Sequence, residues 1–93
     1  MLKEFTGSPH IINLQNLIQT QPAWKVAQRI IEENTQVGAL MLAVASREGR
    51  AEILKQLPEE KSLKVIQALV DLRQPPEFVL STVYDTLKKS FGT

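Results

Sequence analysis

The chain has 93 residues, of which 43% are hydrophobic and 23% charged, and its 11 basic and 10 acidic residues leave a formal charge of +1. This composition is typical of soluble globular domains and lies outside the disordered range. Because the charges are mixed along the chain, nucleic-acid binding through a basic face is not expected. The absence of cysteine excludes disulfides and thiolate metal sites. No apolar run approaches the roughly 18 residues of a membrane span.

Residues 1–93 are expected to form one domain, because a chain of this length supports a single, modest hydrophobic core. Residues 1–7 are expected to be a loose lead-in to that domain. The N-terminal region has neither the basic segment nor the apolar run of a secretory signal. A reducing cytoplasm is the natural setting of a cysteine-free chain, and we expect a cytoplasmic location.

The first two predicted helices follow proline signals. Ser8 is a suitable N-cap and Pro9 a suitable first residue for a helix that runs to about Gln19. A second helix follows Pro22 and ends near Glu33. Helical spacing predicts the inward-facing residues, which are Ile11, Leu14, Leu17 and Ile18 in the first helix and Trp24, Ala27, Ile30 and Ile31 in the second.

The third predicted helix, 36–45, is apolar on almost every side. It is therefore expected at the centre of the fold, covered by the second, fourth and sixth helices. Thr35 is the expected N-cap, and Asn34 is expected to end the preceding helix, since asparagine tolerates a left-handed conformation. Gly38 inside a helix costs on the order of 1 kcal/mol relative to alanine, which predicts the close approach of a neighbouring helix.

Three further helices complete the predicted fold. The fourth follows the N-cap Ser46 and covers residues 47–56, and the fifth follows Pro58 and covers 59–72. Residues 73–76 predict a proline turn, and Pro76 starts a sixth helix that ends before Gly92. No alternating pattern predicts a strand. The expected buried residues are Leu63, Ile66, Leu69 and Val70 in the fifth helix and Val79, Leu80, Val83, Leu87 and Phe91 in the sixth.

The third, fourth and fifth helices share a 12-residue repeat, with units 34–45, 46–57 and 58–69. Each unit begins with a capping residue or proline and ends on apolar residues. Helices this short are unstable alone, so they must pack on one another, as in a helical solenoid. The matching apolar positions are Ala39, Ala51 and Leu63; Met41, Ile53 and Val65; Leu42, Leu54 and Ile66; and Leu57 with Leu69.

Residues suited to catalysis are scarce. His10 is the only histidine and is expected on the surface near the start of a helix. The carboxylates lie mostly near predicted helix N-termini, where they offset the helix dipole. The glycines form neither a phosphate loop nor a dinucleotide motif. We therefore expect no enzymatic activity, no catalytic residues, no cofactor and no metal site.

Several segments in order carry a family resemblance: the polar tetrad 33–36, the apolar helix that follows it, the repeat with Leu57-Pro58, and Pro75-Pro76-Glu77. Over about residues 20–91 this order resembles the middle domain of the flagellar motor switch protein FliG, whose tetrad is Glu-His-Pro-Gln. The resemblance implies an all-α fold of about six short helices in an armadillo-like, right-handed superhelical bundle. The helical repeat is also similar to the N-terminal domain of MgtE-type magnesium transporters.

The resemblance implies a non-enzymatic scaffold of the flagellar motor switch, cytoplasmic and peripheral at the inner membrane. It implies stacking on other FliG-like helical repeats, without membrane insertion, and binding of a FliM-like switch-ring protein. The implied contact residues are Glu33, Asn34, Thr35, Gln36 and Val37. The family's C-terminal torque-generating part is not matched in this sequence, so torque generation by this chain is not implied.

Two alternatives stay open. Asn34 and Thr35 replace the histidine and proline of the family tetrad, and these two residues could simply end one helix and cap the next. The function could also be that of a regulatory domain similar to the MgtE N-terminal domain, or of a motor chaperone. Self-association is a further expectation, because a short solenoid without polar capping helices leaves apolar ends uncovered.

Overall fold

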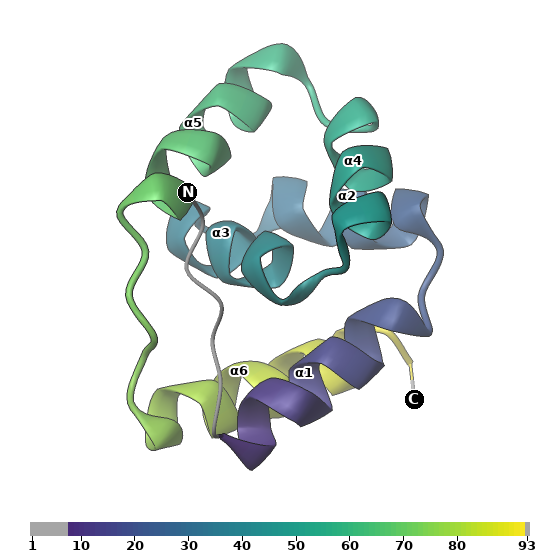
Figure 1. Ribbon diagram of the computed structural model, residues 1–93. Coiled ribbons are helices and arrows are strands. Elements are labelled where there is room, and N and C mark those ends of the chain that lie inside the picture. Colours follow the sequence, from purple (N-terminus) through teal and green to yellow (C-terminus); the bar gives the residue numbers. More distant parts are fainter. Residues whose placement is uncertain (1–7, 93) are drawn as a thin grey trace.

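The computed structural model describes residues 8–92, which form six α-helices and no strand (Figure 1). The predicted all-α class with six short helices is confirmed. The predicted lead-in, residues 1–7, lies outside the described residues. The helices are α1 (Pro9–Gln19), α2 (Ala23–Glu32), α3 (Thr35–Val44), α4 (Arg47–Lys55), α5 (Glu59–Val70) and α6 (Glu77–Ser90).

Polar side chains cap the N-termini of α1, α3 and α4. The Ser8 Oγ accepts from the backbone N–H groups of His10 and Ile11 at the start of α1, and the Ser46 Oγ accepts from Gly49 at the start of α4. Each such bond satisfies an N–H that has no partner within its helix. At the other three helices, a proline occupies the N-cap position: Pro22, Pro58 and Pro76.

The cap of α3 differs from the expectation. Asn34 is its N-cap, because the Asn34 Oδ1 accepts from the Val37 N–H at 2.9 Å, while Thr35 is already the first helical residue. The Asn34 backbone is extended, with φ −68° and ψ 161°, and not left-handed as expected. An N-cap asparagine accepts from the N–H three residues later while its own backbone is extended, so no left-handed residue is needed.

Helix α3 lies at the centre of the fold, as predicted. It packs most extensively on α5 and also contacts α1, α2 and α4. The expectation that α6 covers α3 needs correction, since α6 packs mainly on α1. In Figure 1, α1 and α6 form one layer below the group α2 to α5. One buried cluster draws on all six helices and joins the two layers.

Helices α1 and α6 run parallel (Figure 1). Contacts near their N-terminal ends and near their C-terminal ends are consistent with this orientation. At one end, the Ser8 Oγ donates to the Glu77 Oε2 at 2.9 Å. At the other end, the Lys25 Nζ, in the helix that follows α1, donates to the carbonyl of Phe91 at 3.2 Å. Of the residues predicted to be buried here, Val79 and Val83 are only partly buried. The others are buried as predicted, namely Ile11, Leu14, Leu17, Ile18, Leu80, Leu87 and Phe91.

Two helices bury a different face from the one predicted. In α2, Trp24 and Ile31 are 57% and 45% exposed, while Val26 is buried with Ala27 and Ile30. In α5, Leu69 is buried as expected, but Val65 takes the place of the other three residues. Those three, Leu63, Ile66 and Val70, are exposed. Both helices carry apolar residues on two faces, and only the position of the neighbouring helices decides which face is covered.

The three units of the 12-residue repeat have N-caps and some buried residues at equivalent positions. The first residues of the units, Asn34, Ser46 and Pro58, are the N-caps of α3, α4 and α5. Two apolar positions are buried in every unit: Met41, Ile53 and Val65, and then Ala45, Leu57 and Leu69. The other two positions are buried in α3 but exposed or partly exposed in α4 and α5, because only α3 is surrounded.

The segment after α5 is extended and does not form the expected proline turn; it is called the strap below. Residues 72–76 have no regular secondary structure, and Figure 1 shows them descending from α5 to the start of α6. Consecutive prolines explain this course, since Pro75 and Pro76 have no backbone N–H and the residue before a proline is held in an extended conformation.

Candidate functional site

The five residues predicted to bind a partner, Glu33 to Val37, form the corner between α2 and α3. Glu33 and Asn34 both have extended backbones, with ψ angles of 167° and 161°, and they turn the chain from one helix into the next. Asn34 and Gln36 are exposed, while the other three residues are partly buried. The structure therefore brings the predicted residues together on one accessible surface, which is called the α2–α3 corner below.

Glu33 is held from two sides. Its carboxylate accepts from the Nη2 of Arg29, on the last turn of α2, at 2.8 Å. Its backbone carbonyl accepts from the Lys61 Nζ of α5 at 3.0 Å. The Lys61 contact satisfies a carbonyl at the C-terminus of α2 with a positive charge, which is the sign that a helix C-terminus favours. The backbone of the corner is thus tied to a helix 28 residues further along the chain.

Arg29 links the corner to the end of α6. One of its terminal nitrogens, Nη1, lies 3.3 Å from the Glu32 Oε2 and donates to the Ser90 Oγ, also at 3.3 Å. Its Nε is buried and has no hydrogen-bond partner among the described residues. The carboxylate of Glu33 is therefore engaged within the fold, and the side chain of Gln36 is the more available polar group of the corner.

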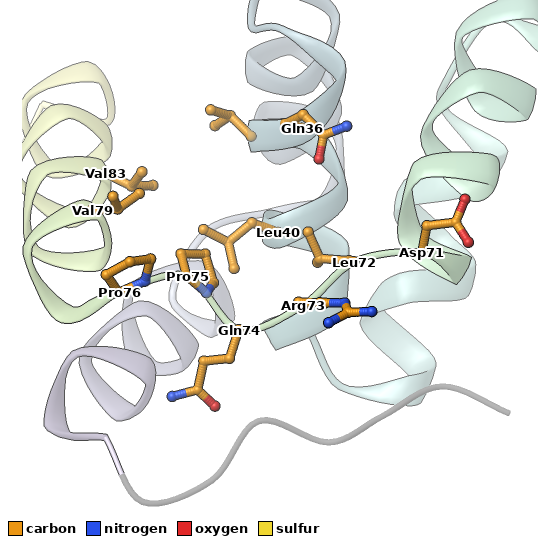
Figure 2. A pocket seen from close by; sticks show the side chains of 11 residues that line it. Gln36, Leu40, Asp71, Leu72, Arg73, Gln74, Pro75, Pro76, Val79 and Val83 are labelled. Atoms are coloured by element: carbon orange, nitrogen blue, oxygen red, sulfur yellow. The ribbon is translucent and has the colours of Figure 1, made fainter.

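A groove of 390 Å³ adjoins the corner, and Gln36 and Val37 belong to both. Figure 2 shows Val79 and Val83 on α6 facing Leu40 across the groove, with Gln36 on the same helix as Leu40. The lining is mainly aliphatic, and polar or charged residues of the strap stand along one side. The remaining lining residues are Asp71, Leu72, Arg73, Gln74, Pro75 and Pro76.

Sequence reasoning missed this groove. Its walls come from α3, the strap and α6, and their juxtaposition depends on how α6 packs on α1. The available signal was Pro75-Pro76, because two consecutive prolines predict an extended segment that stands away from the helices on either side. A helix that followed α5 directly would leave no such opening.

Two further features of the described residues lie outside the corner and its groove. His10 lies 3.6 Å from the Glu77 Oε2 at the joined starts of α1 and α6. A second cavity of 130 Å³ lies between α1, α2 and α4 and is lined largely by apolar and small residues. Within residues 8–92, no group of three acidic, histidine or cysteine side chains is arranged to hold a metal ion. No described helix combines the length and apolarity that a membrane crossing requires.

The chain also matches a known protein family. A family model described as the FliG middle domain matches residues 23–93, from the start of α2 onward. Comparisons with curated proteins and with solved structures gave no match. The matched range contains the α2–α3 corner, the 12-residue repeat, the strap and α6, which are the features that carry the resemblance. The chain therefore belongs to the FliG middle domain family and is a component of the flagellar motor switch.

Proposed function

We propose that the chain is a non-enzymatic scaffold of the motor switch that binds a FliM-like switch-ring protein through the α2–α3 corner and its groove. The observation that carries this proposal is the continuity of the two features, since Gln36 and Val37 belong to both. A polar corner beside an aliphatic groove offers the combination of hydrogen-bonding groups and apolar area that protein interfaces use.

The corner is organised before any partner binds. The Lys61 contact to the Glu33 carbonyl and the Asn34 cap on Val37 fix its backbone. A fixed backbone lowers the entropy that binding must remove. The capping role of Asn34 is compatible with binding, because only its Oδ1 bonds to Val37 and its exposed amide NH₂ can donate to a partner.

The proposal is tested by titrating the chain with the purified FliM-like protein of the same organism, using calorimetry. We expect Gln36→Ala and Val83→Ser each to weaken binding about tenfold, equivalent to ~1.4 kcal/mol. Gln28→Ala is the matched control, because Gln28 is an exposed glutamine on α2 outside the corner. Unchanged affinity in both test variants would show that the partner binds at another surface. Absence of binding by the parent chain would rule out this partner.

The scaffold role has two further parts that we propose with it. The chain stacks on neighbouring FliG-like helical repeats, and it works at the cytoplasmic side of the inner membrane as part of the flagellar basal body. Tagging the chain in motile cells tests both parts, since it should then sediment with basal bodies. Release from basal bodies by Gln36→Ala and retention with Gln28→Ala would support the corner as the attachment point.

A further inference from the structure

The groove beside the α2–α3 corner is open and apolar. Val37, Val79 and Val83 line it and are only partly buried, while Leu40 is buried. Figure 2 shows the two valines of α6 facing Leu40 across the opening. No side chain of residues 8–92 fills its 390 Å³, a volume in the range of pockets that hold small ligands. The groove therefore has room for a large apolar side chain.

Two opposite charges along the groove are unpaired within the described residues. Asp71 and Arg73 both line it and are exposed. Within residues 8–92, neither side chain forms an ion pair or a hydrogen bond. Asp71 is also the C-cap of α5, where the helix dipole disfavours a negative charge. An occupant that brings a cation to Asp71 and an anion to Arg73 would be complementary in charge to this side of the groove.

The residues that precede Ser8 are joined to the described structure beside the groove. The Ser8 Oγ donates to the Glu77 Oε2 at 2.9 Å, and Glu77 directly follows Pro76 at the end of the strap. Fully extended, residues 1–7 span up to about 24 Å, whereas the strap 72–76 spans at most about 18 Å. The segment 1–7 is therefore long enough to reach from Ser8 along the whole strap.

The sequence of residues 1–7, MLKEFTG, contains the groups that the groove lacks. Phe5 is a large apolar side chain, and the adjacent Lys3 and Glu4 carry opposite charges. Ser8 and Glu77 are 69 positions apart in the chain. The same offset along two extended segments places Glu4 beside Arg73, and Lys3 then follows in the direction of Asp71.

We propose that residues 1–7 lie along the strap and occupy the groove of the same chain. Phe5 fills the apolar opening, and Lys3 and Glu4 pair with the two charges along it. One aromatic side chain and two exposed ion pairs only partly offset the entropy lost by ordering the segment. The docked segment therefore exchanges with an open state, and a partner can displace it. This competition rests on the proposed function, whereas the docking itself does not.

The rival contact for Phe5 is the exposed apolar surface at the starts of α1 and α6. Ile12 and Phe78 lie there and are 55% and 73% exposed. The charged groups at this place already face one another, since the His10 Nε2 lies 3.6 Å from the Glu77 Oε2. The two charges of the segment would find no unpaired opposite charges there, so they favour the groove.

Tryptophan fluorescence tests the docking in the full chain. Trp24 is the only tryptophan and is 57% exposed, so Trp24→Phe combined with Phe5→Trp moves the probe into the segment. We expect acrylamide to quench this probe about twofold less than in the same chain with Val79→Ser, because the apolar body of an indole is shielded inside an apolar groove.

Phe78→Ser is the matched control, one residue from Val79, and should leave the shielding unchanged. Loss of shielding with Phe78→Ser and its retention with Val79→Ser would overturn the inference, as would equal quenching in all three chains. Shielding that increases with chain concentration would place the segment on a second copy and would also overturn the inference.

Charge reversal tests the register with the same probe. Glu4→Arg and Arg73→Glu should each make the indole more accessible to the quencher, because each brings like charges together. The double variant should restore the shielding. A double variant that is quenched as strongly as the single variants would overturn the proposed register.

Calorimetric titration with the FliM-like protein measures the competition. Phe5→Ser should bind this protein about three- to tenfold more tightly than the parent, since the docked state withholds part of the chain from binding. Ile12→Ser is the control and should bind like the parent. Unchanged affinity in Phe5→Ser would overturn the role of the segment at the partner site. The fluorescence readouts involve no switch-ring protein, so failure of the docking leaves the partner site intact, and failure of partner binding leaves the docking result standing.

Discussion

Gly38 shows at the scale of one residue how the central helix is packed. A Cβ at this position would lie 3.0 Å from the Ile30 Cγ2 and 3.5 Å from the Val65 Cγ2. Gly38 thus allows α2 and α5 to approach α3 closely, which confirms the neighbouring helix predicted from the sequence. The Ile30 side chain is fully buried, and its branched carbon has little freedom to move aside.

Gly38→Ala is expected to lower the free energy of unfolding by about 1 kcal/mol, although alanine is the better helix former by a similar amount. The reason is that overpacking a filled core costs ~1–3 kcal/mol. Urea unfolding measures the difference. Ala51→Gly, at an exposed position of α4, measures the cost of glycine in a helix of this protein without a change in core packing. A Gly38→Ala chain more stable than the parent would show that Ile30 gives way at little cost.

Arg50, on α4, forms hydrogen bonds to the backbone at the C-terminal end of α3. Its Nε donates to the Leu42 carbonyl at 3.0 Å, and its Nη2 donates to the Ala45 and Ala43 carbonyls at 3.3 and 3.5 Å. The last carbonyls of a helix lack partners in its own hydrogen-bond ladder, and of these three only the Leu42 carbonyl is also given a backbone donor, the Ala45 N–H at 3.2 Å. A cation is also the charge that a helix C-terminus favours.

Arg50→Met should lower the free energy of unfolding by about 1–2 kcal/mol, since it removes charge-assisted hydrogen bonds to the end of the central helix. Arg47→Met is the control, because Arg47 is exposed and one turn away. It should change stability by less than about 0.5 kcal/mol. Chemical denaturation of both variants separates the contribution of the contacts from that of the charge, and equal losses would attribute the effect to charge alone.

At the scale of secondary-structure elements, the α2–α3 corner accepts a proline without rearrangement. Thr35 is the first residue of α3, where a missing N–H has no consequence for the helix ladder. The preceding residue, Asn34, already has the extended backbone that a proline requires of its neighbour. The threonine at position 35, where the family tetrad has proline, therefore alters the side-chain chemistry of the corner more than its backbone conformation.

Thr35→Pro is expected to raise the free energy of unfolding by about 0.4–1 kcal/mol, because it reduces the freedom of the unfolded chain. Gln36→Pro is the comparison, since it moves the ring further into the first turn, and it should bring no gain. Thermal unfolding followed by circular dichroism measures both. Destabilisation by Thr35→Pro would show that the corner uses the Thr35 side chain or N–H in a way that the backbone does not reveal.

At the scale of the whole molecule, we propose that residues 1–93 fold as one domain that includes α1, although α1 precedes the matched range 23–93. Four α1 residues belong to the buried cluster that reaches all other helices. The Ser8 bond to Glu77 joins α1 to α6 across 69 positions of the chain. Separating α1 from the rest would uncover the apolar face of α6.

Leu14→Ala should test this unit, because Leu14 is 1% exposed within α1. We expect it to lower the free energy of unfolding by about 2–5 kcal/mol, with coincident transitions in circular dichroism and in the fluorescence of the single tryptophan, Trp24. Ile12→Ala, exposed on the same helix, should have little effect. Separate transitions for the two probes would mean that α1 unfolds independently of the rest.

The sequence alone determined most of the local structure. Prolines and capping residues located the helix ends, because they act on backbone groups within a few residues. The repeat aligned Met41, Ile53 and Val65, and all three are buried, although helical spacing had predicted a different inward face for the fifth helix. The family and the corner Glu33–Val37 were also recognisable, because they depend on the order of short motifs.

The tertiary structure alone decided which apolar faces are covered. Trp24, Leu63 and Val70 were predicted to be buried, yet they are exposed, because α2 and α5 each have two apolar faces and the sequence does not state which one meets a neighbour. The groove beside the corner likewise depends on α6 packing on α1. Helix periodicity is a local property of the chain, whereas burial is set by contacts between residues far apart in sequence.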